Sequence, residues 1–366
     1  MNNDISERIY YLDGLRSFLI LLVVLVHSSQ VYNPSQGWNI YSEHGSFLVN
    51  FIVEFFGLLR MPTFFMVAGY FAVISLKRAT GLNFLLKRVQ RLLIPLLTVT
   101  FTLNLLQAYL LVHFGWKEYT IDTYFSHGYW VSHLWFLINL IIYTILSYIF
   151  IRYFKTKTKI FLLNISHYLE MSSIYKILFI LPLLNIGLLI IFKFTPEYTL
   201  GLKFNQIIVY IPYYLFGILL AVNRSLLYKF SNISMMVGSI VVVLSYILMR
   251  YFESLNGIEY KIFYYYFKAV GIWFFASFSF TIFKNFLNKK TKILYKISDA
   301  SYTIYLVHHV TVIIIGLILI KLDLDFIIGL PILFLTVVFI SYFFHRKFVL
   351  NYSVLQFLLN GKKVSI

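Results

Sequence analysis

Apolar and polar stretches alternate along the whole chain of 366 residues, and the apolar stretches are long. A helix needs about 20 apolar residues to cross the hydrocarbon core of a membrane, and ten stretches come close to or exceed that length. We therefore predict an all-α integral membrane protein with one transmembrane domain over residues 1–366. The ten predicted spans are residues 12–32, 47–75, 92–114, 133–151, 177–194, 206–222, 232–250, 262–283, 301–320 and 326–345.

The placement of basic residues predicts the orientation of the spans. If the N-terminus lies in the cytoplasm, most of the 31 Lys and Arg residues fall on the cytoplasmic side, as the positive-inside rule requires. With ten spans, both chain ends are then cytoplasmic. Most of the net charge of +17 follows from this topology, so nucleic acid is not an expected partner.

Composition excludes several classes of function. The chain has no cysteine, which excludes thiol catalysis, thiolate metal sites and disulfides. The first apolar run is too long for a cleavable signal and no small-residue cleavage site follows it, so we expect the first helix to be retained. No loop is long enough for a soluble domain. Any chemistry is therefore expected in or beside the helix bundle, within the lipid bilayer.

The first predicted span carries three ionisable residues, Asp13, Arg16 and His27. At 100° per residue, Arg16 and His27 differ by only about 20° in direction, and Asp13 lies within about 60° of both. An ionisable side chain in hydrocarbon costs about 2.5–3.5 kcal/mol on insertion scales, so such groups usually face a bundle interior or an aqueous cavity. The alternative is that Asp13 and Arg16 are interfacial and that His27 lies near the opposite headgroups.

The second predicted span places Arg60 near its centre, two residues before Pro62. Proline removes a backbone hydrogen bond, so we expect a kink that frees carbonyl groups near Arg60. Glu54 lies about 240° around the helix from Arg60, and the two side chains are not expected to pair directly. Arg60 either lines a polar cavity or ties neighbouring helices together.

A basic face precedes the third predicted span. Lys87, Arg88 and Arg91 recur at spacings of three and four residues and therefore share one side of a helix. Such a face can bind the phosphates of a nucleotide-type cofactor, because guanidinium groups make bidentate contacts with phosphate. The same residues are also typical of the basic flank of a span.

Histidines occur near two further spans. His133 stands beside Trp135 at the start of the fourth predicted span, which is typical of an aromatic belt at a membrane edge. In the ninth span Tyr305 is followed by His308 and His309. Adjacent helical positions differ by 100°, so we expect at most one of these two histidines to face a given site. Neither histidines four residues apart nor nearby carboxylates are present, so no metal is expected.

Several motifs follow one another in order along the chain: LDGLR, then His27 eleven residues after Arg16, then RMPTFFMVAGYF, KRVQRLLIP, SHLWFL and ASYTIYLVHH. In this order they resemble the acyltransferase-3 family of bacterial membrane O-acyltransferases. Within the family, SHLWFL, YIPYYLFG, IYLVHH and a C-terminal LNGK are most similar to the glucan biosynthesis protein C branch, which is associated with succinylation of periplasmic glucans. One departure is Ala68-Gly69, where many members have Ser-Gly.

The resemblance implies a role for several residues and a location for the protein. His27 is implied as the catalytic histidine, and Arg16 as the arginine of the first helix. Arg88 and Arg91 match a basic motif linked to the acyl donor, which would be acetyl-CoA or succinyl-CoA. The implied location is the bacterial cytoplasmic (inner) membrane.

We therefore expect an O-acyltransferase that moves an acyl group from cytoplasmic acyl-CoA to a sugar hydroxyl on the outer side. His27 would act as a general base or carry the acyl group covalently, and Arg60 would stabilise the oxyanion or bind a succinyl carboxylate. The acceptor would be a periplasmic glucan, a lipopolysaccharide O-chain or an exopolysaccharide. Candidates for acceptor binding or support are Glu54, His133, Trp135, Tyr305 and His308.

The alternative from another class is a transporter or flippase of glycan intermediates, because intramembrane ionisable residues fit that function equally well. The chain shows no internal repeat, which is the signature of many secondary transporters. A scaffold subunit without activity is a further alternative.

Overall fold

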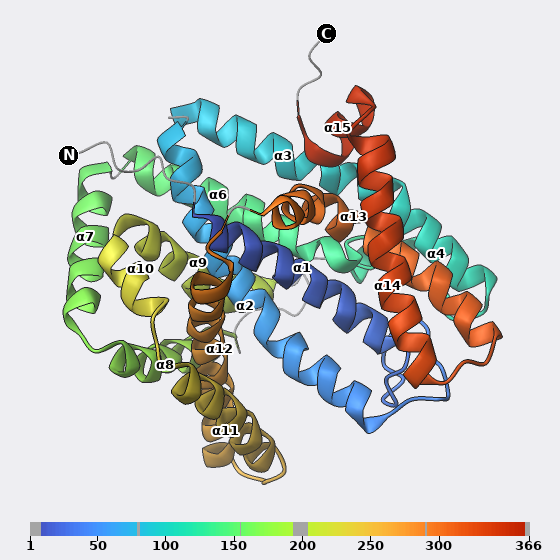
Figure 1. Ribbon diagram of the computed structural model, residues 1–366, viewed down its shortest axis with the longest axis horizontal. Helices are drawn as coiled ribbons and strands as arrows, with labels where there is room; N and C mark the ends of the chain where they lie inside the picture. Colours follow the sequence, from blue (N-terminus) through green and yellow to red (C-terminus); the bar gives the residue numbers. More distant parts are fainter. Residues whose placement is uncertain (1–8, 79–80, 154, 193–203, 290, 363–366) are drawn as a thin grey trace.

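The computed structural model describes residues 9–78, 81–153, 155–192, 204–289 and 291–362, and these residues form helices without any strand (Figure 1). The predicted all-helical class is therefore confirmed. The helices are α1 (Tyr10–Gln30), α2 (Phe47–Arg78), α3 (Gly81–Phe101), α4 (Leu103–His113), α5 (Ile121–Ser126), η1 (Ser132–Leu134), α6 (Trp135–Tyr153), α7 (Lys155–Met171), α8 (Ile174–Phe192), α9 (Phe204–Val222), α10 (Arg224–Phe230), α11 (Met235–Glu253), α12 (Ile258–Leu287), α13 (Lys292–Lys321), α14 (Phe326–Phe344), η2 (His345–Val349) and α15 (Ser353–Asn360).

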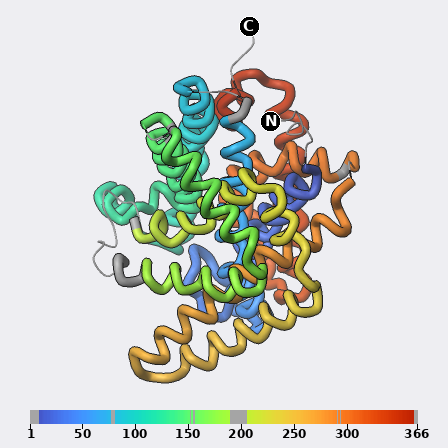
Figure 2. Tube along the Cα trace, turned by 90° about the vertical axis from the view of Figure 1, so that its left-hand side faces the viewer, coloured from blue at the N-terminus to red at the C-terminus, as the bar shows by residue number. Residues whose placement is uncertain are grey.

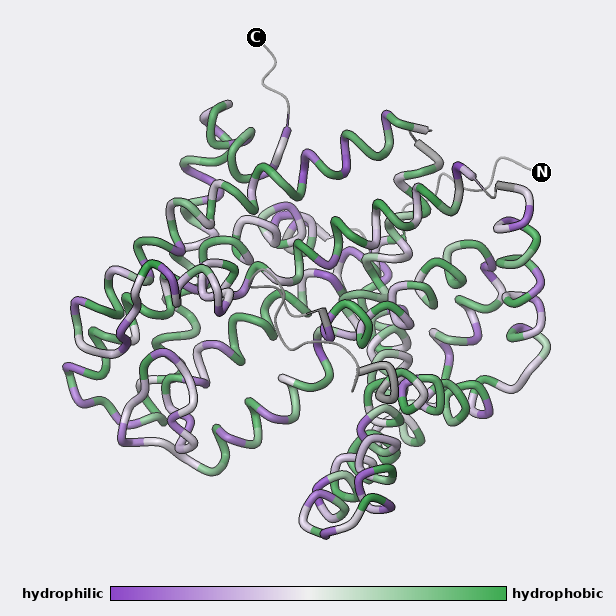
Figure 3. The backbone as a smooth tube through the Cα atoms, turned by 180° about the vertical axis from the view of Figure 1, so that it is seen from behind, coloured by the Kyte–Doolittle hydropathy of each residue, from purple (hydrophilic) through white to green (hydrophobic). Residues whose placement is uncertain are grey.

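Nine helical segments among the described residues are long and apolar enough to cross a membrane. Nine of the predicted spans lie on these segments, and the tenth, 177–194, lies on α8. The apolar stretch found on α8, Ile174–Leu188, is shorter than the other nine, and residues 193 and 194 lie outside the described part of the chain. Hydrophobic residues dominate most of the helices (Figure 3). The chain is thus a multi-pass membrane protein.

The third predicted span differs from the structure at its start. The helix begins at Gly81 rather than near residue 92, and the membrane-length segment continues through α4 to His113. The basic residues Lys87, Arg88 and Arg91 lower the hydropathy of the first turns, but they do not interrupt the helix. This basic face therefore belongs to the same helical segment as the span that it precedes.

The first helix, α1, lies at the centre of the bundle. It packs against α2, α12, α13 and α14 (Figures 1 and 2). Its residues Leu12, Leu15, Leu19 and Val24 have no exposed surface. A helix that is apolar on most of its faces is typically buried on all of them. The polar residues of α1 consequently face the interior of the protein rather than lipid.

Helices α2 and α9 cross at two glycines. A Cβ atom added to Gly69 would lie 2.0 Å from the carbonyl oxygen of Tyr214, and one added to Gly217 would lie 2.0 Å from that of Met66. The two backbones therefore touch where their glycines face one another. The pair Ala68-Gly69, noted above as a departure from Ser-Gly, lies at this crossing. Its glycine has a packing role, and Ala68 lies beside it in the core.

Helices α11 and α12 form an antiparallel hairpin that extends beyond the bundle, on the side away from α15 (Figures 1 and 2). Its connection at residues 254–257 is more hydrophilic than its stems (Figure 3). Glu54 of α2 pairs with this hairpin: its carboxylate accepts a hydrogen bond of 3.0 Å from Tyr246 and lies 3.5 Å from Arg250.

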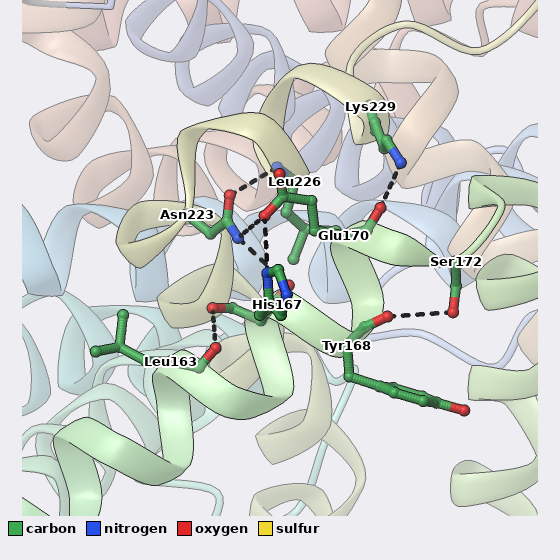
Figure 4. Close-up of polar contacts among 9 residues, drawn as sticks. Leu163, His167, Tyr168, Glu170, Ser172, Asn223, Leu226 and Lys229 are labelled. Carbon is green, nitrogen blue, oxygen red and sulfur yellow. Dashed lines mark hydrogen bonds and ion pairs between the residues drawn. The ribbon is translucent and has the colours of Figure 1, made fainter.

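Helices α7 and α10 are joined by a polar cluster (Figure 4). Asn223 caps α10 by accepting from the Leu226 amide at 3.0 Å, and its Nδ2 donates to Glu170 at 2.8 Å. Lys229 donates to the carbonyl oxygen of Glu170. The Asn223 hydrogen bond holds the pKa of Glu170 below its ordinary value.

Candidate active site

Four histidine rings from three parts of the chain meet at the end of α1. His27 lies 5.3 Å from His308 and 5.0 Å from His309, measured between ring centroids. His133 of η1 lies 5.2 Å from His308 and stacks on His309 at 4.7 Å. The predicted catalytic histidine is therefore one member of a cluster that the fold assembles from α1, η1 and α13.

Of His308 and His309, only His309 lines the cavity described below, in agreement with the expectation that at most one of them faces a given site, although both rings lie beside His27. The two positions do point 100° apart, but their ring centroids are only 5.9 Å apart. Because an imidazole ring extends well beyond the Cβ atom, two neighbouring rings can reach one group that lies between their directions. His27 occupies that place.

Hydrogen bonds orient two rings of the cluster. His308 Nδ1 lies 2.6 Å from the carbonyl oxygen of Tyr305 and therefore donates to it, which leaves Nε2 with the lone pair of a neutral ring. This Nε2 atom is buried and has no hydrogen-bond partner among the described residues, and the same is true of Nδ1 of His27. His309 Nδ1 lies 2.7 Å from Gln107 Oε1. The cluster thus presents unpaired ring nitrogens to a buried space.

Arg60 brings a positive charge close to the cluster. Its guanidinium interacts electrostatically with His27, His308 and Tyr210. Two of its nitrogens, Nε and Nη1, are buried without a hydrogen-bond partner in the described chain. The helix α2 continues through Pro62 without a break. A buried guanidinium with unused donors is suited to an anionic group, whether a bound carboxylate or a charge that develops during a reaction.

A cavity of about 370 Å³ opens onto the histidines and is called the histidine cavity below. Its wall includes His27, His133 and His309, and its other residues are mostly aromatic or carry amides. These are Trp38, Asn39, Gln107, Tyr119, His127, Tyr129, Trp135, Asn139 and Gln206. Burial raises the pKa of Tyr119 to about 12, so its hydroxyl is neutral and can both donate and accept.

A second cavity of about 500 Å³ lies toward the start of α1 and is called the basic cavity below. It is lined by Arg16, Arg88 and Arg91, together with apolar side chains of α2 and α6. Arg16 donates to Ser298 Oγ at 2.8 Å and to the Ser298 carbonyl at 3.2 Å, and Arg88 donates to Ser75 Oγ at 3.1 Å. Arg16 and His27 thus line different cavities. The two residues are about 16 Å apart along one helix.

A thin layer of side chains separates the two cavities. Tyr305 lines the basic cavity, and its hydroxyl donates a hydrogen bond of 2.7 Å to the carbonyl oxygen of His133, which lines the histidine cavity. The adjacent residues Phe136 and Trp135 likewise line the basic and the histidine cavity, respectively. Residues that are hydrogen-bonded or adjacent in the chain thus line opposite cavities, so only a layer of aromatic side chains separates the two spaces.

Five predicted site residues line neither cavity, namely Asp13, Glu54, Arg60, Lys87 and His308, of which Arg60 and His308 lie at the histidine cluster. Asp13 is buried 3.7 Å from Arg16 and lines neither cavity, and Lys87 is exposed on α3. Glu54 is bound to the α11 hairpin as described above, and no contact of the described residues joins it to the histidines. The predicted absence of a Glu54–Arg60 pair agrees with this arrangement.

Sequence reasoning missed two residues around the histidines, Trp38 and Gln107. Trp38 lies 6.0 Å from His27 and 5.3 Å from His309 between ring centroids, in the loop between α1 and α2. Gln107 and His309 form the hydrogen-bonded pair. A tryptophan in a polar loop and a glutamine inside an apolar span were the available signals, because both are costly where they stand unless they have a partner.

No group of three or more His, Cys, Asp or Glu residues in the described chain has the geometry to hold a metal ion. The four rings are held by packing and by hydrogen bonds to Tyr305 and Gln107, and Nδ1 of His27, both ring nitrogens of His133 and Nε2 of His308 have no hydrogen-bond partner among the described residues. This arrangement is suited to transferring protons to and from a substrate hydroxyl.

Comparison with known proteins identifies the family of the chain. Residues 9–346 match the acyltransferase domain of the acyltransferase-3 family. The chain is 27% identical over 323 residues to the glucans biosynthesis protein C of Salmonella typhimurium (strain LT2) and to that of Salmonella typhi, covering 84% of this chain and 83% of each relative. No solved structure matches the chain. The chain therefore belongs to the acyltransferase-3 family of membrane acyltransferases.

Proposed function

We propose that the protein transfers an acyl group from acyl-CoA, bound in the basic cavity, to a hydroxyl of a glycan bound in the histidine cavity. The observation that carries this proposal is the thin layer at Tyr305 and His133, across which two cavities of different chemistry approach each other. A thioester reaching this layer from one side would meet a hydroxyl arriving from the other. Neither substrate would need to cross the membrane whole.

The basic cavity suits a donor with a charged end and an apolar end. Guanidinium groups of Arg88 and Arg91 would bind phosphates, whereas Phe64, Val67 and Leu140 would contact the uncharged arm. If the chain ends are cytoplasmic, as the basic residues predict, this cavity opens to the compartment that contains acyl-CoA. The donor would then be acetyl-CoA or succinyl-CoA, and the protein would lie in the bacterial cytoplasmic membrane.

The histidine cavity suits a sugar acceptor. Aromatic rings such as Trp38 and Trp135 offer faces against which sugar C–H groups can pack, and Asn39, Gln107 and Gln206 offer amides for sugar hydroxyls. The two Salmonella relatives are glucans biosynthesis proteins, which supports a glucan as the acceptor. Lipopolysaccharide O-chain and exopolysaccharide carry the same hydroxyl chemistry.

In the proposed reaction, His27 removes the proton of the attacking hydroxyl while its oxygen bonds to the thioester carbonyl carbon. The C–S bond then breaks, and the proton passes from His27 to the leaving sulfur, which gives the ester and free coenzyme A. A general base of this kind typically contributes about 10²–10⁴-fold. Arg60 would stabilise the oxyanion or, with a succinyl donor, bind its free carboxylate. A covalent acyl-histidine is the other possible route.

The test uses purified protein in proteoliposomes with radiolabelled acetyl-CoA or succinyl-CoA on one side and glucan on the other. The proposal expects label in the glucan, and it expects His27→Ala to reduce transfer by about 10²–10⁴-fold at equal protein level. Unchanged transfer by His27→Ala would refute the role of His27. Movement of unmodified glycan without transfer would instead identify a transporter.

A further inference from the structure

The C-terminal end of the described chain forms part of the wall of the basic cavity. Helix α15 packs on α3 (Figure 1). Both Asn360 and Lys362 line this cavity beside Arg88 and Arg91. These two residues belong to the LNGK motif, to which the proposed reaction gives no role. We call residues 360–362 the C-terminal strap.

Gly361 fixes the course of the strap over α3. Its backbone is left-handed with φ 57°, and its amide donates to the carbonyl oxygen of Phe357 at 2.8 Å, which ends α15. Its own carbonyl oxygen accepts from Gln90 Nε2 at 3.1 Å. A Cβ atom at this position would lie 2.5 Å from Arg91 Cα. A glycine is therefore required here, and it holds Lys362 against the helix that carries the arginines.

The cations of the basic cavity occupy two levels. Arg88 is half-buried and reaches inward to Ser75 Oγ and to the carbonyl oxygen of Ala68, at 3.1 and 3.4 Å. Arg91 and Lys362 are exposed and therefore lie at the rim. Asp299 is the one carboxylate among the described residues of this wall, and it lies 3.3 Å from Nε2 of His345. The rim therefore keeps an excess of positive charge.

We propose that the C-terminal strap is part of the donor site and that Lys362 binds a phosphate of the nucleotide end of acyl-CoA, beside Arg91. This inference rests on the proposed function, because it assumes that acyl-CoA is the occupant of the basic cavity. The uncharged arm of the donor then extends inward past Arg88 toward Tyr305. The strap thereby couples the fold of the C-terminal segment to donor binding.

The test measures the dissociation constant of coenzyme A for the full-length protein in detergent, without any acceptor. Lys362→Ala is expected to weaken binding about tenfold, the loss typical of one charge-assisted hydrogen bond, and Lys362→Arg is expected to restore most of it. Lys347→Ala is the matched control, because Lys347 is an exposed cation of η2 that does not line the cavity. It removes the same charge and should leave binding unchanged.

A parallel titration with 3′-dephospho-coenzyme A identifies the phosphate. If Lys362 binds the 3′-phosphate, the effect of Lys362→Ala disappears with this ligand, and if it binds the diphosphate, the effect is the same for both ligands. Binding by Lys362→Ala that equals wild type, while Arg88→Ala weakens it, would overturn the role of the strap alone. A wild-type protein that is folded but binds no coenzyme A would instead overturn the proposed function.

Discussion

The crossing of α2 and α9 leaves no room for a side chain on either of its glycines. Gly69→Ala would place a Cβ atom 2.0 Å from the carbonyl oxygen of Tyr214, whereas a close C···O contact is about 3.3 Å. The helices must therefore separate by about 1.3 Å, and since the obstructing atom belongs to the backbone, no rotamer change can relieve the contact. Overpacking of this kind typically costs about 1–3 kcal/mol. Gly217→Ala is expected to cost a similar amount, because its Cβ would meet Met66 in the same way.

The assay is thermal unfolding of the purified protein, followed by size-exclusion chromatography of heated samples. Gly187→Ala on α8 is the matched control, because nothing lies within 4 Å of a Cβ at that position. Gly69→Ala should lower the midpoint, and Gly187→Ala should leave it unchanged or raise it, since alanine favours a helix over glycine by about 1 kcal/mol. The two crossing variants should also combine with less than additive effect, because either one alone separates the helices. A midpoint for Gly69→Ala equal to that of Gly187→Ala would refute the reasoning.

Three further outcomes are expected. Gln107→Leu removes the hydrogen-bond partner of His309 and should slow acyl transfer by about tenfold, which corresponds to the loss of one hydrogen bond. The Michaelis constant for the donor should stay unchanged. A change in that constant alone would contradict this assignment. Arg88→Ala should raise the Michaelis constant for the donor by about tenfold or more and leave that for the acceptor unchanged, as steady-state kinetics can show. The pKa of Glu170 is lowered in the folded protein, so its contribution to stability is present above its ordinary value of 4.5 and is lost as the pH falls through the folded value. Thermal unfolding between pH 3 and 7 should therefore show a smaller acid destabilisation for Glu170→Gln than for wild type.

The class of fold followed from hydropathy because lipid requires every backbone polar group to be satisfied within a segment. The helix boundaries were predicted less well from hydropathy, because hydropathy measures side chains and not backbone hydrogen bonds. The start of α3 at Gly81 shows this, since its charged first turns have a low hydropathy and are still helical. The orientation of the chain ends remains a prediction from the basic residues.

The candidate site was partly visible in the sequence. The shared face of Arg16 and His27 is a property of one helix, so periodicity could find it, and both residues line cavities. The meeting of His27 with His133 and His309 depends on how η1 and α13 pack against α1, which no local pattern encodes. Their roles in catalysis stay predictions until they are measured.

The thin layer at Tyr305 and His133 also has an electrical consequence. Where aqueous cavities enter a membrane protein from both sides, the transmembrane potential falls mainly across the layer between them, at about 2.3 kcal/mol per elementary charge per 100 mV. In the proposed reaction the acyl group would pass this layer as an uncharged carbonyl, but a proton or a succinyl carboxylate would pass it as a charge. The rate of transfer in energised vesicles would then depend on the voltage with either donor, because the proton crosses in both cases, and more steeply with a succinyl donor, whose carboxylate crosses as well.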